Sequence, residues 1–325
     1  MVNGGIDRQL TRLLNSWPES LAREFRAYRA ALCHARGRNL PQWGQSSSPY
    51  WYDLPEWIRR AEGARARAIT PRAARDAGWG ESCLMYAIRI QDDLLDGQLG
   101  RTSLAVAPAL LHCEAARVFM SMIGNRPQFW RYYYRAVRGT IGGILRASAL
   151  QRDPGAPEKD LLESYAEVDS IFTIGPAAIY MVGGNRTAHG NVRALVGEFG
   201  KAFQILDDME DVEEDLSDGR FNYAARVLSR VCGRPAGPDL LRNMTPGDLN
   251  RGLAEIASTL GRIATRASRL NARIGSPVPE EVFESLRTPP AWKPGRVPGP
   301  KQHDFVCSSH HSSLSSRERV SHWRT

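Results

Sequence analysis

The chain has 325 residues, of which 42% are hydrophobic and 24% are charged. This length and composition allow one large domain with a sizeable core and exclude a wholly disordered protein. Most of the net charge of +8 comes from the last 39 residues, where seven Lys or Arg stand against two acidic residues, so the charge gives no reason to expect a nucleic-acid partner.

Cysteine usage and hydropathy set the expected compartment. The five cysteines are scattered without a CxxC pair, which argues against a disulfide scaffold and against a zinc site. No apolar run reaches the roughly 20 residues of a membrane span. The polar start, MVNGGIDRQL, lacks the apolar stretch of a secretion signal. We therefore expect a soluble, cytoplasmic protein without an integral membrane segment.

The predicted elements are helical throughout. An N-terminal helical segment is expected over residues 1–37, and the Pro-, Ser- and aromatic-rich stretch 38–57 predicts a loop. Apolar residues then recur at three- and four-residue spacing between 81 and 275, and no comparable window alternates as a strand does. The fold class is therefore all-α, with the main helical bundle over 58–287.

Two later features modify this bundle. Gly175 and Pro176 lie inside a predicted helix of about 160–184 and should kink it, because proline lacks the backbone donor and clashes with the preceding turn. Pro and Ser become frequent from Ser276 onward, and residues 288–325 are predicted to be a disordered basic tail. The folded part of the chain after Arg220 is therefore expected to be short.

The stretch IRIQDDLLDGQLG (88–100) places Asp92, Asp93 and Asp96 within about one turn of predicted helix. Residues four apart share a helix face, so Asp92 and Asp96 stack on each other. The apolar residues around them imply burial nearby, and like charges at this spacing repel. A solvated helix face would explain one such cluster; a bound cation is the alternative.

A second acidic cluster follows at 203–215, FQILDDMEDVEED. Asp207, Asp211 and Asp215 fall in a row down one helix face, with Asp208 beside them. Mg²⁺ takes oxygen ligands and is typically held by one or two carboxylates together with substrate phosphate oxygens. Two such helices facing each other would clamp a diphosphate, and an apolar cavity below would protect the carbocation formed when it leaves.

The stretches IQDDLLD and GKAFQILDDMEDVEED resemble the two aspartate-rich motifs of the trans-isoprenyl diphosphate synthase (polyprenyl synthetase) family. The resemblance covers roughly residues 80–230 and implies the class I isoprenoid synthase fold. It implies roughly three Mg²⁺ ions bridged by the substrate. The catalytic residues so implied are Asp92, Asp93, Asp96, Asp207, Asp208 and Asp211. The metal ligands so implied are Asp92, Asp96, Asp207, Asp211 and Asp215.

The resemblance also implies four substrate-binding residues. Arg101 stands alone where the family has an Arg pair, and Thr173 aligns with the Thr of a Lys-Thr pair whose Lys is Phe172 here. Gln204 would orient the second cluster or touch the substrate, although an ordinary interhelical hydrogen bond explains it equally well. Arg220 would contact the diphosphate; a surface ion pair is the alternative.

The reaction expected from these motifs starts with an allylic isoprenyl diphosphate, which Mg²⁺ ionises with release of pyrophosphate. The family's Gly-Lys-x-x-Arg stretch is absent, and a second diphosphate would lack cations. We therefore favour terpene cyclisation. The alternatives are head-to-tail prenyl transfer, head-to-head coupling of the squalene or phytoene type, and a non-catalytic subunit of a prenyl synthase. Isopentenyl diphosphate and a second copy of the chain are candidate partners.

Overall fold

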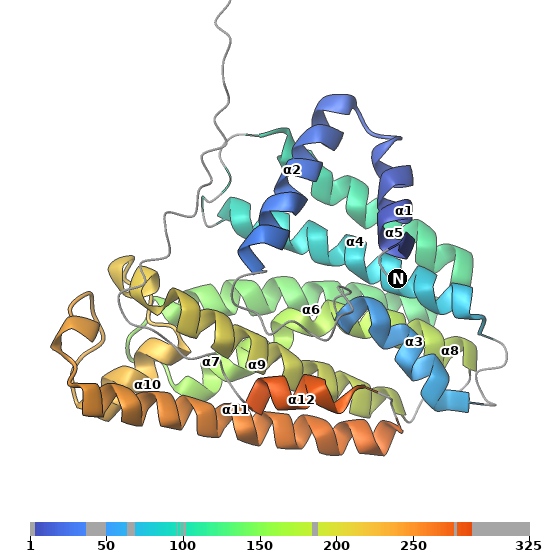
Figure 1. Cartoon of the computed structure of the whole chain (residues 1–325). Helices are drawn as coiled ribbons and strands as arrows, with labels where there is room; N and C mark the ends of the chain where they lie inside the picture. Colours follow the sequence, from blue (N-terminus) through green and yellow to red (C-terminus); the bar gives the residue numbers. More distant parts are fainter. Residues whose placement is uncertain are drawn as a thin grey trace, which may run out of the picture. The chain divides into compact units, whose positions relative to one another are not determined.

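The computed structural model describes residues 4–36, 50–63, 69–95, 97, 99, 102–183, 188–275 and 278–287. Every regular element in these ranges is a helix, which confirms the predicted all-α class (Figure 1). In chain order the elements are α1 (Gly4–Leu14), α2 (Glu19–Arg36), α3 (Tyr50–Glu62), α4 (Pro71–Leu95), η2 (Ser103–Val106), α5 (Ala107–Ile123), α6 (Pro127–Gln151), α7 (Glu158–Val168), η3 (Asp169–Thr173), α8 (Ile174–Gly183), α9 (Ala188–Ser217), α10 (Tyr223–Cys232), η4 (Leu241–Asn243), α11 (Pro246–Ile274) and α12 (Glu280–Arg287).

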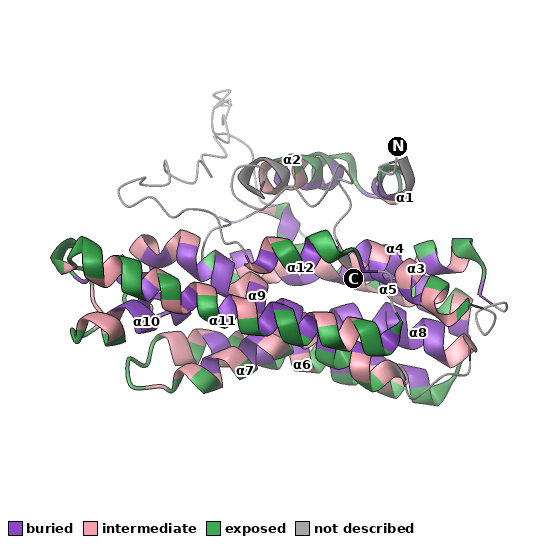
Figure 2. Cartoon of the chain, turned by 60° about the horizontal axis from the view of Figure 1, so that its bottom comes forward, coloured by how far each residue is buried: buried purple, intermediate pink, exposed green. Residues whose placement is uncertain are grey.

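Helices α4 and α9 are the two long elements that carry the acidic clusters. Helix α4 packs against α3, α5 and α8, whereas α9 packs against α7 and α11. Small residues allow the close approach on α4: a Cβ on Gly78 would lie 2.2 Å from the carbonyl oxygen of Tyr52 on α3. Figure 2 shows the buried residues of α8 and α9 inside the bundle and exposed residues along α11 and α12. The two acidic helices therefore share α8 and η3 as neighbours and otherwise pack against different helices.

The N-terminal part differs from the sequence prediction in two ways. The expected single helix is two helices, because Pro18 stands between α1 and α2 and cannot donate the backbone hydrogen bond of a continuous helix. Helix α3 begins at Tyr50, inside the predicted loop 38–57. Burial of Leu54 and Ile58 on one face explains this helix, since tertiary packing outweighs the local preference of proline and serine for loops.

The predicted kink at Gly175 and Pro176 lies elsewhere. The chain breaks earlier, at η3, and Pro176 is the third residue of α8, where a missing backbone donor costs little. Side chains from other helices accept the N–H groups that the break releases. The hydroxyl of Thr140 accepts from the Ile171 N–H (3.1 Å), and Glu81 accepts from the Gly175 N–H (2.8 Å). Helices α6 and α4 therefore stabilise the bend.

The described part of the chain after Arg220 contains α10, η4, α11 and α12 and extends to Arg287. Helix α11 has 29 residues and packs along α9. It starts with a capping box between Thr245 and Asp248 and ends at Gly275, whose φ of +64° suits glycine. Helix α12 follows, and its Phe283 stacks on Phe199 of α9 (ring centroids 5.8 Å apart). The predicted disordered tail, 288–325, lies outside the described residues.

One stretch, Ser103–Ile123, is long and apolar enough to cross a bilayer by length and composition. The sequence analysis expected no such run. Core helices of globular proteins pass the same test, and here α5 packs along α4 and buries Leu111 and Phe119 completely. Packing inside the bundle therefore accounts for part of this apolar surface, while Leu110 and Met120 remain exposed.

Candidate active site

The first acidic cluster lies in the last turn of α4. Asp93 is buried (3% exposed), accepts a hydrogen bond from the Tyr28 hydroxyl (2.6 Å) and pairs with Arg89 (3.0 Å). Asp92 is partly exposed and lies 3.5 Å from the same guanidinium. Asp96 lies outside the described residues. Asp93 is therefore committed to protein contacts, and Asp92 is the more accessible carboxylate.

The second cluster contains a buried carboxylate of the same kind. Asp208 on α9 is 5% exposed and accepts hydrogen bonds from the Tyr165 hydroxyl (2.6 Å) and the Tyr223 backbone N–H (2.8 Å). Burial raises the pKa of Asp208 well above its usual value, against the lowering effect of these two hydrogen bonds. Asp208 thus joins α9 to α7 and to the start of α10.

The rest of the second cluster divides into accessible and committed members. Asp207 is exposed and Asp211 partly exposed. Asp215 is buried, accepts from the Asn222 side chain (2.7 Å) and pairs with Arg220 (3.0 Å). Burial raises the pKa of Asp215, and the charge of Arg220 and the hydrogen bond from Asn222 partly offset this rise. Asp207 and Asp211 are therefore the members best placed to meet a ligand.

Arg89 connects the two clusters electrostatically. Burial alone would lower the pKa of Arg89, but the charges of Asp93, Asp207 and Asp92 raise it above its usual value. Asp207 therefore lies near enough across the bundle to act on a side chain of α4. Helices α4 and α9 run the same way in Figure 1, so their acidic C-terminal parts lie at one end of the bundle.

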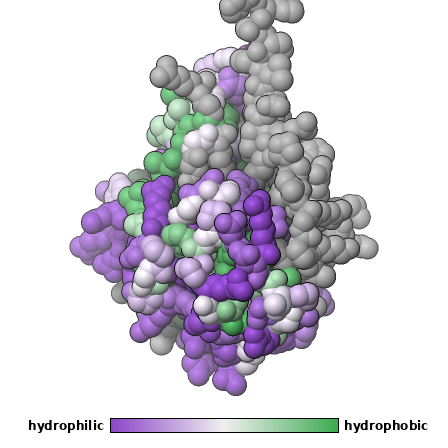
Figure 3. Space-filling view, turned by 90° about the vertical axis from the view of Figure 1, so that its left-hand side faces the viewer, coloured by the Kyte–Doolittle hydropathy of each residue, from purple (hydrophilic) through white to green (hydrophobic). Residues whose placement is uncertain are grey.

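Figure 3 looks onto this end and shows a mainly hydrophilic face with hydrophobic residues between the polar ones. Beneath the clusters the interior is apolar: Leu84 and Ile205 are fully buried and Ile88 nearly so. The acidic side chains thus lie at one end of a bundle whose buried side chains are apolar. A polar head group bound at these carboxylates would have hydrocarbon side chains beneath it.

The expected substrate-binding residues have these positions. Thr173 is buried in η3, where its hydroxyl lies 2.5 Å from the Tyr132 hydroxyl and donates to the Ser170 carbonyl. Gln204 is half-buried on α9, one turn before Asp208, whereas Arg101 lies outside the described residues. Thr173 is therefore occupied by protein contacts in this structure.

Phe172, which replaces the family's Lys, and Arg220, the fourth expected substrate-binding residue, also make protein contacts. Phe172 stacks on Trp51 with ring centroids 5.1 Å apart, so the place of the family's Lys is part of the apolar core. Arg220 pairs with Asp218 (3.1 Å) as well as with Asp215. Its guanidinium would have to leave these carboxylates, at least in part, to contact a diphosphate.

The donors available to a metal ion are oxygens. In the described part of the chain no three His, Cys, Asp or Glu side chains converge into a complete metal site. Mg²⁺ does not require one, because it is commonly held by one or two carboxylates with water and substrate phosphates completing the octahedron. Asp92, Asp207 and Asp211 fit that requirement in chemistry and accessibility. Asp93, Asp208 and Asp215 instead hold the helices that present them.

Comparison with known proteins gives the fold. No family model and no curated protein matches the chain. A polyprenyl synthase from Caulobacter crescentus, solved with calcium and isoprenyl diphosphate, matches with TM-score 0.62 and 16% identity over 87% of this chain and 91% of that chain. The chain has the fold of the polyprenyl diphosphate synthases. A decaprenyl diphosphate synthase from Rhodobacter capsulatus also matches, with TM-score 0.59 and 12% identity over 83% of this chain and 98% of that chain. A geranylgeranyl pyrophosphate synthase from Geoglobus acetivorans matches with TM-score 0.58 and 15% identity over 87% of this chain and 96% of that chain.

Within this polyprenyl synthase fold, sequence reasoning missed Arg89 and Tyr28. Arg89 lies three and four residues before Asp92 and Asp93, and helical spacing alone predicts that such pairs meet. Tyr28 is 65 residues from Asp93 in the sequence, and no local sequence pattern predicts that contact. Asn222, which caps α10 and bonds Asp215, follows the Gly-Arg pair and could have been recognised as a helix start.

Proposed function

We propose that the protein is a class I isoprenoid synthase that transfers an allylic prenyl group head-to-tail to isopentenyl diphosphate. The carbon–oxygen bond of the allylic diphosphate would break, diphosphate would leave, and a new carbon–carbon bond would form with loss of a proton. The observation that carries the proposal is that Asp92 and Asp93 of α4 pair with Arg89, whose pKa the charge of Asp207 on α9 also raises, at one end of a bundle with an apolar interior.

Prenyl transfer is preferred to the terpene cyclisation that the sequence analysis favoured. The solved structures with this fold named above are a polyprenyl, a decaprenyl and a geranylgeranyl diphosphate synthase. The preference for cyclisation rested on the absence of the family's cationic residues for a second diphosphate, which is an argument from sequence alone. The fold therefore supports the head-to-tail alternative better than the cyclisation preference.

Each acidic residue has a distinct part in this proposal. Asp92, Asp207 and Asp211 would hold the metal, and Mg²⁺ when bound would supply positive charge to the departing diphosphate. Arg89 adds a fixed positive charge between the two helices. Asp93 and Asp208 keep the helices in place through Tyr28 and Tyr165. The buried apolar residues below would keep water from the cation that forms.

Product analysis tests the proposal. The purified protein is incubated with Mg²⁺ and C10, C15 or C20 allylic diphosphates, each with and without isopentenyl diphosphate. A longer diphosphate formed only with both substrates would support head-to-tail transfer. Hydrocarbon or alcohol from one allylic substrate alone would support cyclisation instead. No turnover together with binding to a second prenyl synthase would overturn the proposal in favour of a non-catalytic subunit.

A second copy of the chain is a further expected partner. Large apolar side chains are exposed on neighbouring elements: Val106 on η2, Leu110 and Met120 on α5, and Tyr134, Ile141 and Leu145 on α6. Burying them against another copy would remove apolar surface from water. Light scattering at micromolar concentration should give the mass of a dimer. A monomer mass across the concentration range would contradict this expectation.

A further inference from the structure

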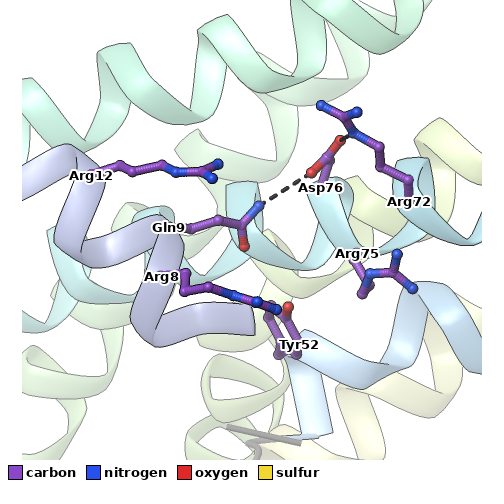
Figure 4. Close-up of a pocket in the computed structure, with 7 residues that line it drawn as sticks. All are labelled: Arg8, Gln9, Arg12, Tyr52, Arg72, Arg75 and Asp76. Carbon is purple, nitrogen blue, oxygen red and sulfur yellow. Dashed lines mark hydrogen bonds and ion pairs between the residues drawn. The ribbon is translucent and has the colours of Figure 1, made fainter. Parts of the chain in front are cut away.

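A cavity of about 350 Å³ lies at the opposite end of α4 from the acidic clusters. Arg8 and Arg12 reach it from α1, Arg72 and Arg75 from the first turns of α4, and Tyr52 from α3 (Figure 4). Arg72 precedes Asp92 by 20 residues, and at 1.5 Å per helical residue the two ends are about 30 Å apart. The cavity is therefore separate from the proposed active site.

Positive charge in this cavity exceeds negative charge. Its lining has four arginines and one carboxylate, Asp76, which accepts from Gln9 (3.2 Å) and lies 3.8 Å from Arg72. Among the described residues, Arg8, Arg12 and Arg75 make no ion pair or side-chain hydrogen bond. Three guanidinium groups thus share one cavity without a protein partner.

Helix α4 adds to this excess through its own dipole. The N-terminus of a helix carries partial positive charge and favours acidic side chains nearby. The first turn of α4 contains no acidic residue and starts with Pro71 and Arg72. The arginines therefore oppose the preference of the helix, and an anion in the cavity would meet both the guanidinium groups and the positive helix end.

The buried member of the cavity, Tyr52, shows how close these charges lie. Burial raises the pKa of Tyr52, as do the charges of Asp53 and Asp76, whereas the charges of Arg75 and Arg8 lower it. Tyr52 is 4% exposed, and arginines from both α4 and α1 act on this buried lining residue. Its hydroxyl offers one further hydrogen-bond donor to an anion.

We propose that this cavity binds a small molecule that carries two or more phosphate charges. Guanidinium groups match phosphate oxygens in pairs, and several of them around one anion favour a multiply charged ligand over a carboxylate. The volume lies near the lower limit of small-molecule pockets, which suits a compact polyphosphate head. The proposal does not depend on the reaction proposed for the acidic end.

Calorimetric titration with sodium diphosphate in EDTA tests this site in the full-length protein. Without divalent metal the acidic clusters repel the anion, so binding reports the cationic cavity. We expect one diphosphate per chain, with affinity that falls as salt is added because the arginines are largely exposed. Absence of binding up to millimolar diphosphate, together with no binding to phosphatidic acid vesicles, would overturn the proposal.

The matched variants replace pairs of exposed arginines three residues apart on a helix. Arg72→Gln/Arg75→Gln should weaken diphosphate binding about tenfold or more, since each lost charged hydrogen bond reduces affinity by roughly that factor. Arg135→Gln/Arg138→Gln on α6 changes the net charge equally outside the cavity and should leave binding unchanged. Equal weakening in both variants would overturn a specific site, and circular dichroism confirms that both remain folded.

Vesicle sedimentation identifies the source of the phosphate. Binding to phosphatidic acid vesicles but not to diphosphate, lost in Arg72→Gln/Arg75→Gln, would support the site with a lipid head group as its ligand. Binding to diphosphate without vesicle binding would support a soluble phosphorylated ligand. Vesicle binding that Arg135→Gln/Arg138→Gln weakens as much as the cavity variant would contradict the proposal.

Discussion

The two ends of α4 carry opposite charges and hold them in different ways. At the C-terminal end Asp93 is buried and satisfied by Tyr28 and Arg89. At the N-terminal end Arg72 is 86% exposed and lies 3.8 Å from Asp76. Both ends also oppose the helix dipole, because the first turn has no acidic residue and the last turn no basic one. Unlike buried Asp93, the accessible charges at both ends of α4 can meet ligands from solvent.

The largest effect is expected at the accessible part of the acidic end. Asp207→Ala, and likewise Asp92→Ala, should lower prenyl transfer about 10²- to 10³-fold, because a group that holds charge against the leaving diphosphate is lost. Steady-state kinetics with Mg²⁺ measure this. Asp239→Ala, which removes an exposed carboxylate that pairs with Arg242 between α10 and α11, is the control. Full activity in Asp207→Ala would remove this residue from the site.

A buried acidic residue should instead affect stability. Asp208→Ala should lower the free energy of unfolding by about 3 kcal/mol, because the Tyr165 hydroxyl and the Tyr223 N–H lose their acceptor inside the bundle. Urea unfolding followed by circular dichroism gives the value. The neighbouring Asp207→Ala should change it by less than about 0.5 kcal/mol. Equal losses in both variants would contradict the division between accessible and buried carboxylates.

Arg89 allows a further test of the acidic end of α4, because its guanidinium is a positive charge among the carboxylates there. Arg89→Leu should bind Mn²⁺ about tenfold more tightly than the wild type, equivalent to about 1.4 kcal/mol, since the carboxylates lose a competing positive charge. Electron paramagnetic resonance of free Mn²⁺ measures this without substrate. Arg89→Lys keeps the charge and should behave as the wild type. Unchanged affinity in Arg89→Leu would mean that Arg89 does not compete with the metal.

The middle of α4 provides a pH test. Burial raises the pKa of Glu81 well above its usual value, and the Gly175 N–H bond only partly opposes this. The folded protein therefore holds this proton more tightly than the unfolded chain, so stability falls as pH rises above the unfolded pKa of about 4.3. Glu81→Gln should flatten that decline between pH 5 and pH 8 in urea unfolding. Parallel pH profiles for variant and wild type would contradict this account.

The smallest effect is expected at the basic end. Arg72→Gln/Arg75→Gln should leave the free energy of unfolding within about 0.5 kcal/mol of the wild type, or raise it slightly, because a charge that opposes the helix dipole is removed. Thermal unfolding at low and high salt measures this, and any gain should vanish at high salt. A clear loss of stability would show that these arginines support the fold.

The sequence could predict the helical class because the three- and four-residue spacing of apolar residues is a local property of the chain. The same holds for the acidic residues: Asp92 and Asp207 were placed on helix faces by spacing alone. The prediction of a loop over 38–57 is wrong from Tyr50 onward, where α3 begins, because burial of Leu54 and Ile58 depends on partners far along the chain. Local preference does not include such partners.

What the sequence by itself determined is which residues share a helix face, such as Asp207, Asp211 and Asp215. Only the tertiary structure decided which carboxylates are accessible, since Tyr28 and Tyr165 bury Asp93 and Asp208 from 65 and 43 residues away. It also brought the arginines of α1 and α4 to one cavity. The physical reason is that helical periodicity acts over a few residues, whereas burial and charge depend on whatever the fold brings near.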